Sequence, residues 1–590
     1  MTNVFQAFFR LQNLILICIL TLAFFLRINQ LDEHGIFFDE KATLLVSQGM
    51  AMEGSTQKNC FNTPNKSTFT PQEFWQEKSL QDYFEANRRS DIGNSPAYYL
   101  VLHFWTKAFG LSDYAIRFFS VLWSIATIIL LFFFVKEHFK NNNLALICAG
   151  LMAIEPFFIA VSQQARNYSM SFFFTLLATH IFLKIIKREE KERSAAGLYW
   201  TYGFLSAVCL LSHFLTATVF MAHGLYVLLF VRKLRPWIFL PLSLCIGGAF
   251  FGYWITFGGG DYTFKTLAYQ AKVYYQEAHS VPNPHAGYID PATPKNVLKK
   301  ATPIFLDLFI LANGLINKMI GFRNLALAIL VALLSVFSLN RYFKNQQTIW
   351  LWGIIALNAI AFFVYSTGKF QFLAFVNLSL LFYLLLHSFK AKKEVFEQRL
   401  LVFMAILAFL PSIFLVIMTF KNGHTFGLTQ RYSGFSFPYS IIFVGLAISQ
   451  VKWEIKPLNF FIFAVLFAHL VYVGQTIQEV LNDVSVKYNY RSEARSKNPY
   501  PAIAQKLTKY YQTGDTILYP SYIESFYAAD TLGKVEKQSN LDAQYVNLYL
   551  PKDAQFIQKV NITERNKVFL KKKDGRLLEI FDLKEKKYRY

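Results

Sequence analysis

Long runs of apolar residues constrain this chain more than any other feature of its sequence. A helix that crosses a bilayer needs about 17 to 25 mostly apolar residues, because its backbone must satisfy its own hydrogen bonds there. Runs of this kind recur from the N-terminus to about residue 476. With 54% hydrophobic residues among 590, the chain is too apolar for a soluble protein and too long for one span. The sequence therefore predicts a mainly α-helical, polytopic membrane protein whose first partner is the lipid bilayer.

These runs predict thirteen spans. The spans lie near residues 13–29, 112–135, 144–160, 168–186, 198–212, 214–231, 236–257, 322–339, 348–366, 370–389, 400–420, 436–450 and 457–476. The first run ends at Arg27 and acidic residues without a small-residue cleavage site, so it is predicted to be a retained span. Residues 198–231 fit either two short spans that turn near His213 or one long tilted helix.

The distribution of Lys and Arg predicts the orientation. Short connections on the side of the N-terminus hold nineteen basic residues, and those on the other side hold four. The N-terminus is therefore predicted to be cytoplasmic and the C-terminus to lie outside an inner (plasma) membrane. Pro303–Ile320, interrupted by Asp307, is predicted to lie along the surface, because a span there would invert every later connection. The excess of basic over acidic residues, 59 to 37, is scattered between apolar runs, which argues against nucleic acid as a partner.

Three larger pieces are predicted to face outward: residues 30–96, residues 258–302 and a tail from about 477 to 590. The chain therefore divides into a membrane domain, residues 1–476, and an outward C-terminal domain, residues 477–590. The tail has few long apolar runs and several β-rich segments, so it is predicted to be a small α/β domain. Its expected elements are a helix over Ala502–Tyr511 and strands at Thr516–Pro520, Gln544–Leu550 and Leu577–Leu583.

Charged residues near the outer ends of the early spans are the candidates for chemistry. Asp39 and Glu40 follow the first span, in Gly35-Ile-Phe-Phe-Asp-Glu-Lys-Ala. Acidic residues at such a boundary are either solvated loop charges or functional groups. Glu155 lies inside the end of a span, where an unpaired charge is costly, so it is expected to have a partner or to line a wet cavity. Arg166 and Tyr168 follow it at the same predicted interface.

Four motifs in order resemble signatures of one family, the GT-C glycosyltransferases of the protein mannosyltransferase and aminoarabinose-transferase superfamily. They are Asn94-Ser-Pro-Ala-Tyr-Tyr-Leu, Phe109-Gly-Leu-Ser-Asp-Tyr-Ala-Ile-Arg-Phe-Phe-Ser, Ser162-Gln-Gln-Ala-Arg-Asn-Tyr and Thr429-Gln-Arg-Tyr-Ser-Gly-Phe-Ser-Phe-Pro. The resemblance covers residues 10–480 in layout and is sharpest over 30–190. It implies a GT-C bundle that moves a sugar from a polyprenyl-phosphate donor to an envelope acceptor, which is a lipid, a glycan or a protein.

The resemblance also implies roles for particular residues. The catalytic group includes Asp39 as the base, with Glu40 beside it and Glu155 before a proline. Basic residues in outer connections, namely Arg166, Lys369 and Arg431, are expected to bind the donor phosphate, and Tyr168, Tyr432 and Asn94 to position the substrate. Relatives carry a cation before the interfacial helix, whereas this chain has Asn94-Ser95-Pro96.

This chemistry needs no general acid, because a departing phosphate has a second pKa of about 6. One carboxylate suffices to take the acceptor proton while Arg or Lys stabilises the phosphate, which predicts inversion by single displacement. No cofactor is required and no zinc motif is found; a divalent cation bridging the carboxylates and the phosphate is an alternative. The alternative functions are a transporter or flippase, a polymerase of lipid-linked polysaccharide, and a non-catalytic assembly protein.

Overall fold

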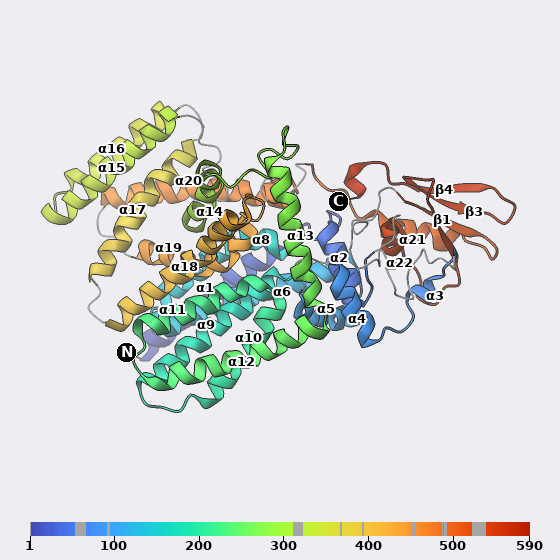
Figure 1. The fold of residues 1–590 in the computed structure, drawn as a ribbon. Helices are drawn as coiled ribbons and strands as arrows, with labels where there is room; N and C mark the ends of the chain where they lie inside the picture. The colour runs from blue at the N-terminus through green and yellow to red at the C-terminus, as the bar shows by residue number, and fades with distance from the viewer. Residues whose placement is uncertain are drawn as a thin grey trace.

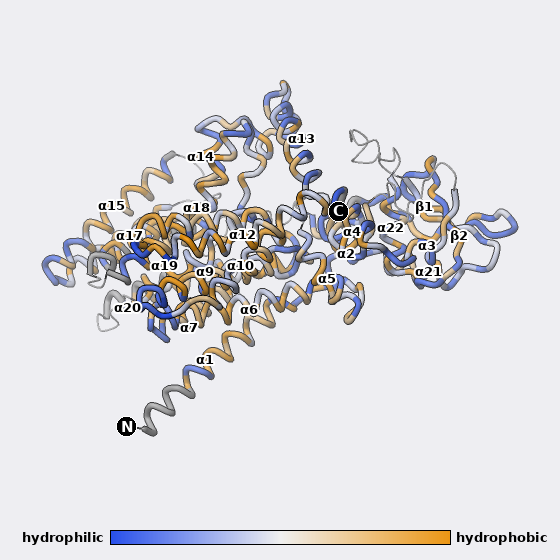
Figure 2. The backbone as a smooth tube through the Cα atoms, turned by 60° about the horizontal axis from the view of Figure 1, so that its bottom comes forward, coloured by the Kyte–Doolittle hydropathy of each residue, from blue (hydrophilic) through white to orange (hydrophobic). Residues whose placement is uncertain are grey.

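Helices make up most of the computed structural model, and one small β-sheet lies near the C-terminus (Figure 1). The structure describes the chain except Met1, Tyr590 and residues 53–66, 91–94, 311–321, 366–368, 392–394, 450–455, 486–487, 489–492 and 522–538. In Figure 1 the helical bundle occupies the left and centre, and the sheet lies at the right, beyond the short helices α2 (Phe38–Ser47), α4 (Leu80–Ser90) and α5 (Pro96–Phe109). The bundle helices are mostly apolar in Figure 2, whereas polar stretches gather in the connections and around the sheet.

The bundle contains the longest helices of the chain. Its first half consists of α1 (Thr2–Ile28), α6 (Asp113–Phe139), α7 (Asn142–Ile154), α8 (Pro156–Ser162), α9 (Tyr168–Glu190), α10 (Ala196–Ser212), α11 (Ala217–Phe230) and α12 (Leu234–Phe257). Its second half consists of α15 (Phe322–Asn345), α16 (Ile349–Val364), α17 (Lys369–Ala391), α18 (Val395–Asn422), the 3₁₀ segment η3 (Gln430–Ser436), α19 (Phe437–Ser449) and α20 (Lys456–Leu481).

Seven of the described helices are long and apolar enough to cross a membrane, or eight when the bent pair α7 and α8 is counted as one span. α10, α11 and α16 are apolar but shorter than 18 residues. The prediction of a mainly helical, multi-span membrane protein is confirmed, whereas the count of thirteen spans is not. α17 and α20 are 23 and 26 residues long, so the number of spans stays a prediction.

The break at His213 settles the choice for residues 198–231 in favour of two helices. His213 has an extended backbone (φ −162°, ψ 127°) that ends α10. Its ring Nδ1 then accepts the backbone N–H of Leu215 at 3.2 Å and caps the short segment η1 (Phe214–Thr216), which leads into α11. The histidine thus supplies the hydrogen bond that the start of the second helix needs.

A second break separates α7 from α8, whose axes differ by 58°. Pro156 has no N–H to continue α7, so the helix ends at Ile154. Arg27 from the end of α1 donates to two carbonyls of the last turn of α7, those of Met152 (3.2 Å) and Ala153 (2.9 Å). The bend is therefore held by a cation from another helix, and it places Glu155 at the junction.

Two groups of shorter helices lie between the long ones. The first outer connection contains α2 (Phe38–Ser47), α3 (Pro71–Phe74), α4 (Leu80–Ser90) and α5 (Pro96–Phe109), and the second contains α13 (Gly260–His279) and α14 (Pro294–Ile310). On α5, Leu100, Phe104 and Phe109 are about 60% exposed, as expected of a helix in the membrane interface. α14 covers the first part of the segment Pro303–Ile320, and its remainder lies outside the described residues.

The C-terminal segment contains a four-stranded sheet. It is built from α21 (Pro499–Tyr510), α22 (Leu541–Asn547), β1 (Thr516–Pro520), β2 (Ile557–Asn561), β3 (Lys567–Lys571) and β4 (Leu577–Asp582). The strand order is β2-β1-β3-β4, and only the pair β1 and β2 is parallel among the described strands. The predicted helix and the strands β1 and β4 are present in this sheet domain.

The predicted strand at Gln544–Leu550 is wrong, because this stretch begins inside the helix α22. All seven residues of α22 are buried, including its polar ones. Gln544 donates to the carbonyl of Ala51 at 2.9 Å, and Asn547 donates to the side chain of Gln558 at 2.8 Å. These partners lie elsewhere in the chain, so a local β pattern could not reveal that a buried helix would be satisfied here.

The first outer connection and the C-terminal segment share one apolar core. Phe69 pairs with Gln558 of β2 in an antiparallel bridge, and Gly35 donates its N–H to the carbonyl of Ser496 at 2.8 Å. Trp75 donates its indole N–H to the carbonyl of Asn547, also at 2.8 Å. The segment after α1 is therefore held from the C-terminal side.

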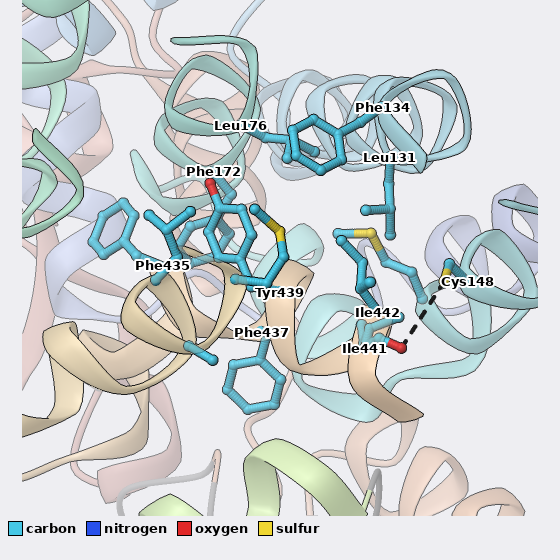
Figure 3. Close-up of a cluster of buried hydrophobic side chains, with 14 of the residues drawn as sticks. Leu131, Phe134, Cys148, Phe172, Leu176, Phe435, Phe437, Tyr439, Ile441 and Ile442 are labelled. Carbon is cyan, nitrogen blue, oxygen red and sulfur yellow. Dashed lines mark hydrogen bonds between the residues drawn. The ribbon is translucent and has the colours of Figure 1, made fainter. Parts of the chain in front are cut away.

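Aromatic packing fixes η3 against the bundle (Figure 3). The rings of Phe157 on α8 and Phe437 at the start of α19 are stacked 4.6 Å apart. Phe435 of η3 meets Phe172 of α9 edge-on at 5.1 Å. A Cβ atom at Gly434 would collide with the rings of Phe172 and Phe157, so only glycine allows this close approach. The packing holds η3 against α8 and α9.

Candidate active site

Glu40 is the most completely bound carboxylate near the start of α2. Its side chain has no exposed surface, and Arg117 of α6 donates to both of its oxygens, at 2.9 and 2.8 Å. The backbone N–H groups of Ala165 (2.8 Å) and Phe37 (3.0 Å) donate to the same carboxylate. Burial by itself raises the pKa of Glu40, but the charge and hydrogen bonds of Arg117 outweigh it and the pKa is lowered. Glu40 is therefore held as a buried anion.

Arg117 joins this carboxylate to the chain that leads into α2. It donates to the backbone carbonyls of Leu31 (2.9 Å), His34 and Gly35 (3.1 Å) as well as to Glu40. Arg117 lies within one of the four sequence motifs, but the sequence reasoning assigned it no role. A charged residue inside an apolar run near the outer end of a span, the signal that singled out Glu155, also applies to Arg117.

Asp39, one residue earlier, lies in a more open environment. Its side chain is 38% exposed, and its Oδ2 lies 3.7 Å from Nη1 of Arg431 in η3. The guanidinium of Arg431 lies over the ring of Tyr432, 5.4 Å from its centroid. The fold thus brings together a carboxylate and an arginine that are almost 400 positions apart in the sequence.

Arg166 holds the first turn of α2 from the other side. Its Nη1 donates to the backbone carbonyl of Asp39 (3.1 Å) and to the hydroxyl of Thr43 (2.6 Å). The residue is 6% exposed. Arg166 therefore lies beside the candidate carboxylate, and these contacts join it to the backbone of α2.

Two tyrosines predicted to position substrate lie near the same pair. Tyr168 begins α9 and lies within electrostatic range of Asp39 and Arg431. The ring of His213 lies between the two tyrosines, with centroids 5.6 Å from Tyr168 and 6.3 Å from Tyr432. The break between α10 and α11 therefore contributes the ring of His213 to the surroundings of the site. The sequence reasoning gave His213 no role there.

Tyr288 from the second outer connection is a further neighbour that the sequence reasoning missed. It lies within electrostatic range of Asp39 and Arg431. Lys300 of α14 holds its loop by donating to the carbonyl of Tyr288 (2.6 Å) and to the hydroxyl of Thr425 (2.7 Å). No local motif marks Tyr288, because its position depends on how this loop folds back toward η3.

Glu155 lies at the bend between α7 and α8 and has no exposed surface. One of its oxygens accepts the backbone N–H of Phe157 at 3.3 Å, which caps α8. Arg27, which binds the carbonyls at the end of α7, lies within electrostatic range of it. Arg27, a cation from a neighbouring span, therefore lies near Glu155. This pairing is the structural explanation of a buried Glu155, as opposed to a catalytic one.

Lys369 is a predicted phosphate-binding residue that the structure places away from Asp39 and Arg431. Lys369 begins α17, and its ammonium lies over the ring of Phe362, 5.1 Å from the centroid. α17 lies at the far left in Figures 1 and 2, well separated from α2. Asn94 lies outside the described residues.

The C-terminal segment completes the surroundings of Glu40. Arg495 is paired with Asp483 at 2.8 Å, donates to the carbonyl of Gly35 at 3.0 Å and lies 3.6 Å from Glu40. Lys41 is buried against the rings of Tyr500 and Tyr545, at 5.1 and 5.2 Å from their centroids.

Burial lowers the pKa of Lys41 to about 8. The residues of the C-terminal segment that contact Gly35, Glu40 and Lys41 belong to none of the motifs found in the sequence. Among the described residues no group of three or more His, Cys, Asp and Glu side chains is arranged to hold a metal ion.

Comparison with known families adds an independent observation. Residues 93–254 match the model of a family described as dolichyl-phosphate-mannose-protein mannosyltransferase. The matched region includes Arg117, Glu155, Arg166 and Tyr168, whereas Asp39 and Arg431 lie outside it. The resemblance to this superfamily of membrane glycosyltransferases is therefore confirmed, and the match locates it in the helices that surround α2. No curated protein matches the chain.

Several solved structures are similar to this chain at low identity, among them the following two. One is ArnT from Cupriavidus metallidurans bound to undecaprenyl phosphate, with a TM-score of 0.44 and 12% identity over 91% of this chain and 85% of that one. The other is the Archaeoglobus fulgidus oligosaccharyltransferase in complex with Zn and sulfate, with a TM-score of 0.41 and 13% identity over 94% of this chain and 63% of that one.

Proposed function

We propose that this protein is a GT-C membrane glycosyltransferase that moves a sugar from a polyprenyl-phosphate donor to an envelope acceptor on the outer face of the inner membrane. The observation that carries the proposal is the pair of Asp39 and Arg431, 3.7 Å apart and both partly exposed. The family match supports a lipid-phosphate-linked sugar as the donor.

In the proposed reaction Asp39 is the general base. The acceptor hydroxyl loses its proton to the Asp39 carboxylate as its oxygen forms a bond to the anomeric carbon. The bond from that carbon to the phosphate oxygen breaks on the opposite face, so the configuration inverts. The lipid phosphate leaves as an anion that needs no proton at neutral pH, because its second pKa is about 6.

Arg431 is proposed to bind the donor phosphate. A guanidinium presents several N–H donors in one plane, which suits the oxygens of a phosphate that gains charge as it departs. Its distance of 3.7 Å from Asp39 is that of a loose ion pair rather than a short hydrogen bond. A donor phosphate that accepted hydrogen bonds from the Arg431 guanidinium would weaken its interaction with Asp39, so the carboxylate would accept a proton more readily.

The neighbouring residues are proposed to hold this pair in place. Glu40 and Arg166 fix the first turn of α2, and Tyr168 and Tyr432 position the substrate. Glu155 is proposed to keep the bend between α7 and α8.

A divalent ion that bridged Asp39, Glu40 or Glu155 to the donor phosphate is the alternative. At Glu40 or Glu155 it would require a fully buried carboxylate to leave its hydrogen bonds, whereas Asp39 is 38% exposed. The proposed reaction does not depend on such an ion.

The test is complementation of a deletion strain, with mass spectrometry of lipid-linked sugars and envelope glycans. The deletion should accumulate one lipid-linked sugar and lose one envelope modification, which would also identify donor and acceptor. Asp39→Asn should behave as the deletion at normal protein level. Glu33→Gln, an exposed carboxylate in the same connection, is the matched control and should restore the modification. Full complementation by Asp39→Asn would refute the proposed base.

A further inference from the structure

A groove lies at the end of the bundle opposite Asp39. α9 begins with Tyr168 near the candidate site and ends at Glu190, 23 residues later. At a rise of 1.5 Å per residue this is about 35 Å, close to the thickness of a bilayer core. The loop after α9 and the start of α12 therefore lie at the other membrane surface from the candidate site.

The larger part of this groove is an apolar cavity of about 580 Å³ between α10 and α12. Tyr199, Trp200, Phe239, Leu242 and Ile246 are among its lining residues. Trp200 is 63% and Leu242 58% exposed, so the cavity opens on the side of the bundle that faces lipid. Its volume is that of a typical ligand pocket rather than of a packing defect.

A second cavity of about 190 Å³ adjoins it, since Glu189 lines both. Arg232, Lys233 and Arg399 line the second cavity, and Arg235 lines the larger one. These four cations outnumber the carboxylates that line the groove, those of Glu189 and Glu190, so its polar end carries a net positive charge.

Two of the four cations already have partners. Lys233 donates to the carbonyl of Glu189 at 2.8 Å and pairs with Glu192 at 3.3 Å, and Arg399 lies 3.8 Å from Glu190. The carboxylate of Glu189 accepts the hydroxyl of Tyr199 at 3.3 Å, and the residue is only 5% exposed.

The other two cations are free to bind an anion. Arg232 and Arg235 are exposed, and neither forms an ion pair with any residue that the structure describes. The groove thus joins an apolar slot open to lipid with two unpaired guanidinium groups at the membrane surface.

We infer that this groove binds one anionic phospholipid, with an acyl chain in the apolar cavity and the phosphate group at Arg232 and Arg235. Charge complementarity favours an anionic over a zwitterionic lipid, since basic residues at a membrane surface attract negative headgroups. A bilayer phospholipid is the occupant because this face of α10 and α12 is bathed in such lipids. The inference is independent of the transferase proposal, because the groove shares no residue with the site at Asp39.

The test uses the full-length protein in nanodiscs of phosphatidylglycerol and phosphatidylethanolamine in equal amounts. Native mass spectrometry of the released protein then reports which lipid is retained. We expect one phosphatidylglycerol to be retained selectively, and the double variant Arg232→Gln, Arg235→Gln to bind it roughly 30-fold more weakly. Leu242→Trp, which fills the apolar cavity without changing the charge, should also lose it.

Arg341→Gln is the matched control, since it removes an exposed arginine on α15 that packs on Phe337. This variant should retain phosphatidylglycerol, and thermal unfolding should show that all the variants are folded. Equal retention of phosphatidylethanolamine, or undiminished binding by the double variant, would overturn the inference. Displacement of phosphatidylglycerol by an equimolar polyprenyl phosphate would also overturn it, because the occupant would then be the sugar carrier.

Discussion

The two adjacent carboxylates at the start of α2 lie in opposite environments, one buried and one partly exposed. On the face toward α6 and the C-terminal segment, Glu40 is fully buried and receives donors from Arg117 and from two backbone N–H groups. On the face toward η3, Asp39 is 38% exposed and lies 3.7 Å from Arg431. A buried, fully bonded anion is costly to disturb, whereas an exposed and loosely paired one can exchange a proton.

This difference supports the proposed roles, in which Glu40 stabilises the start of α2 and Asp39 takes part in the chemistry. Because the carboxylates are adjacent, the rigid contacts of Glu40 also fix where the backbone presents Asp39. The proposed active site needs such an anchor, since the proposed base is on a short helix between connections rather than within the bundle. The predictions below separate the two roles.

The largest effect is expected for Asp39→Asn. Loss of a general base typically lowers the rate by about 10²- to 10⁴-fold, while the exposed position leaves folding intact. Transfer of labelled sugar by the purified protein and its thermal unfolding would be measured together. The separate roles proposed for Asp39 and Glu40 are contradicted if this variant retains transfer, or if it unfolds at a clearly lower temperature than the Glu33→Gln control.

Glu40→Gln should mainly reduce stability. It leaves the Arg117 charge buried without its counter-ion, which typically costs about 3–5 kcal/mol. The pKa of Glu40 is lowered in the folded protein, so its stabilisation is present above its unfolded pKa of about 4.3 and is lost as the pH falls below that value.

Denaturant unfolding of the Glu40 variant would be compared with the double variant Glu40→Gln, Arg117→Met. The double variant should recover part of the loss, because no buried charge is then left unpaired. If the double variant loses as much stability as the single variants Glu40→Gln and Arg117→Met together, Glu40 and Arg117 do not act as a pair.

Arg431→Ala should weaken use of the donor. A hydrogen bond to a charged group contributes about 1.5–3 kcal/mol, which corresponds to about a 10- to 150-fold fall in kcat/KM, expressed mainly in the KM for the donor. Donor titration at saturating acceptor measures this split. Lys421→Ala, an exposed cation at the end of α18, should leave the donor KM unchanged. An unchanged KM in the Arg431 variant would place the phosphate elsewhere.

The smallest effect is expected for Lys41→Met. The pKa of Lys41 is about 8 in the folded protein and about 10.4 when unfolded, so its burial penalty is full below pH 8 and fades as the pH rises. The native protein should therefore gain stability relative to the variant between pH 7.5 and 9.5. Thermal unfolding at these two pH values tests this, with Lys509→Met on the surface of α21 as control. Parallel pH responses in the two variants would contradict the burial of a titrating Lys41.

The site was predictable from sequence only in part. Asp39, Arg431, Tyr168 and Tyr432 were named from motifs, and the structure brings these four together. Arg117 and Arg495, which lie against Glu40, were not named. The position of Arg117 inside an apolar run was a signal of function, but the sequence does not show which carboxylate an arginine binds.

Lys369 is the opposite case, a residue that was named from the sequence but lies away from Asp39. It lies in a connection that was predicted to be outward, as the phosphate role requires, yet the helix that it begins is packed away from α2. Sequence order and predicted sidedness indicate which residues share a membrane surface. They do not indicate which of those residues are neighbours on it.

Apolar runs by themselves determined that this chain is a multi-span helical membrane protein, because a buried backbone in lipid leaves helices as the available structure. The motifs by themselves determined its resemblance to the protein mannosyltransferase superfamily. Only the tertiary structure decided that Glu40 is an anchor, that Asp39 meets Arg431 and that residues 541–547 form a buried helix. Each of these outcomes depends on a partner that is distant in the sequence, from 77 positions for Glu40 and Arg117 to 493 for Gln544 and Ala51. Burial and pairing are properties of the assembled fold.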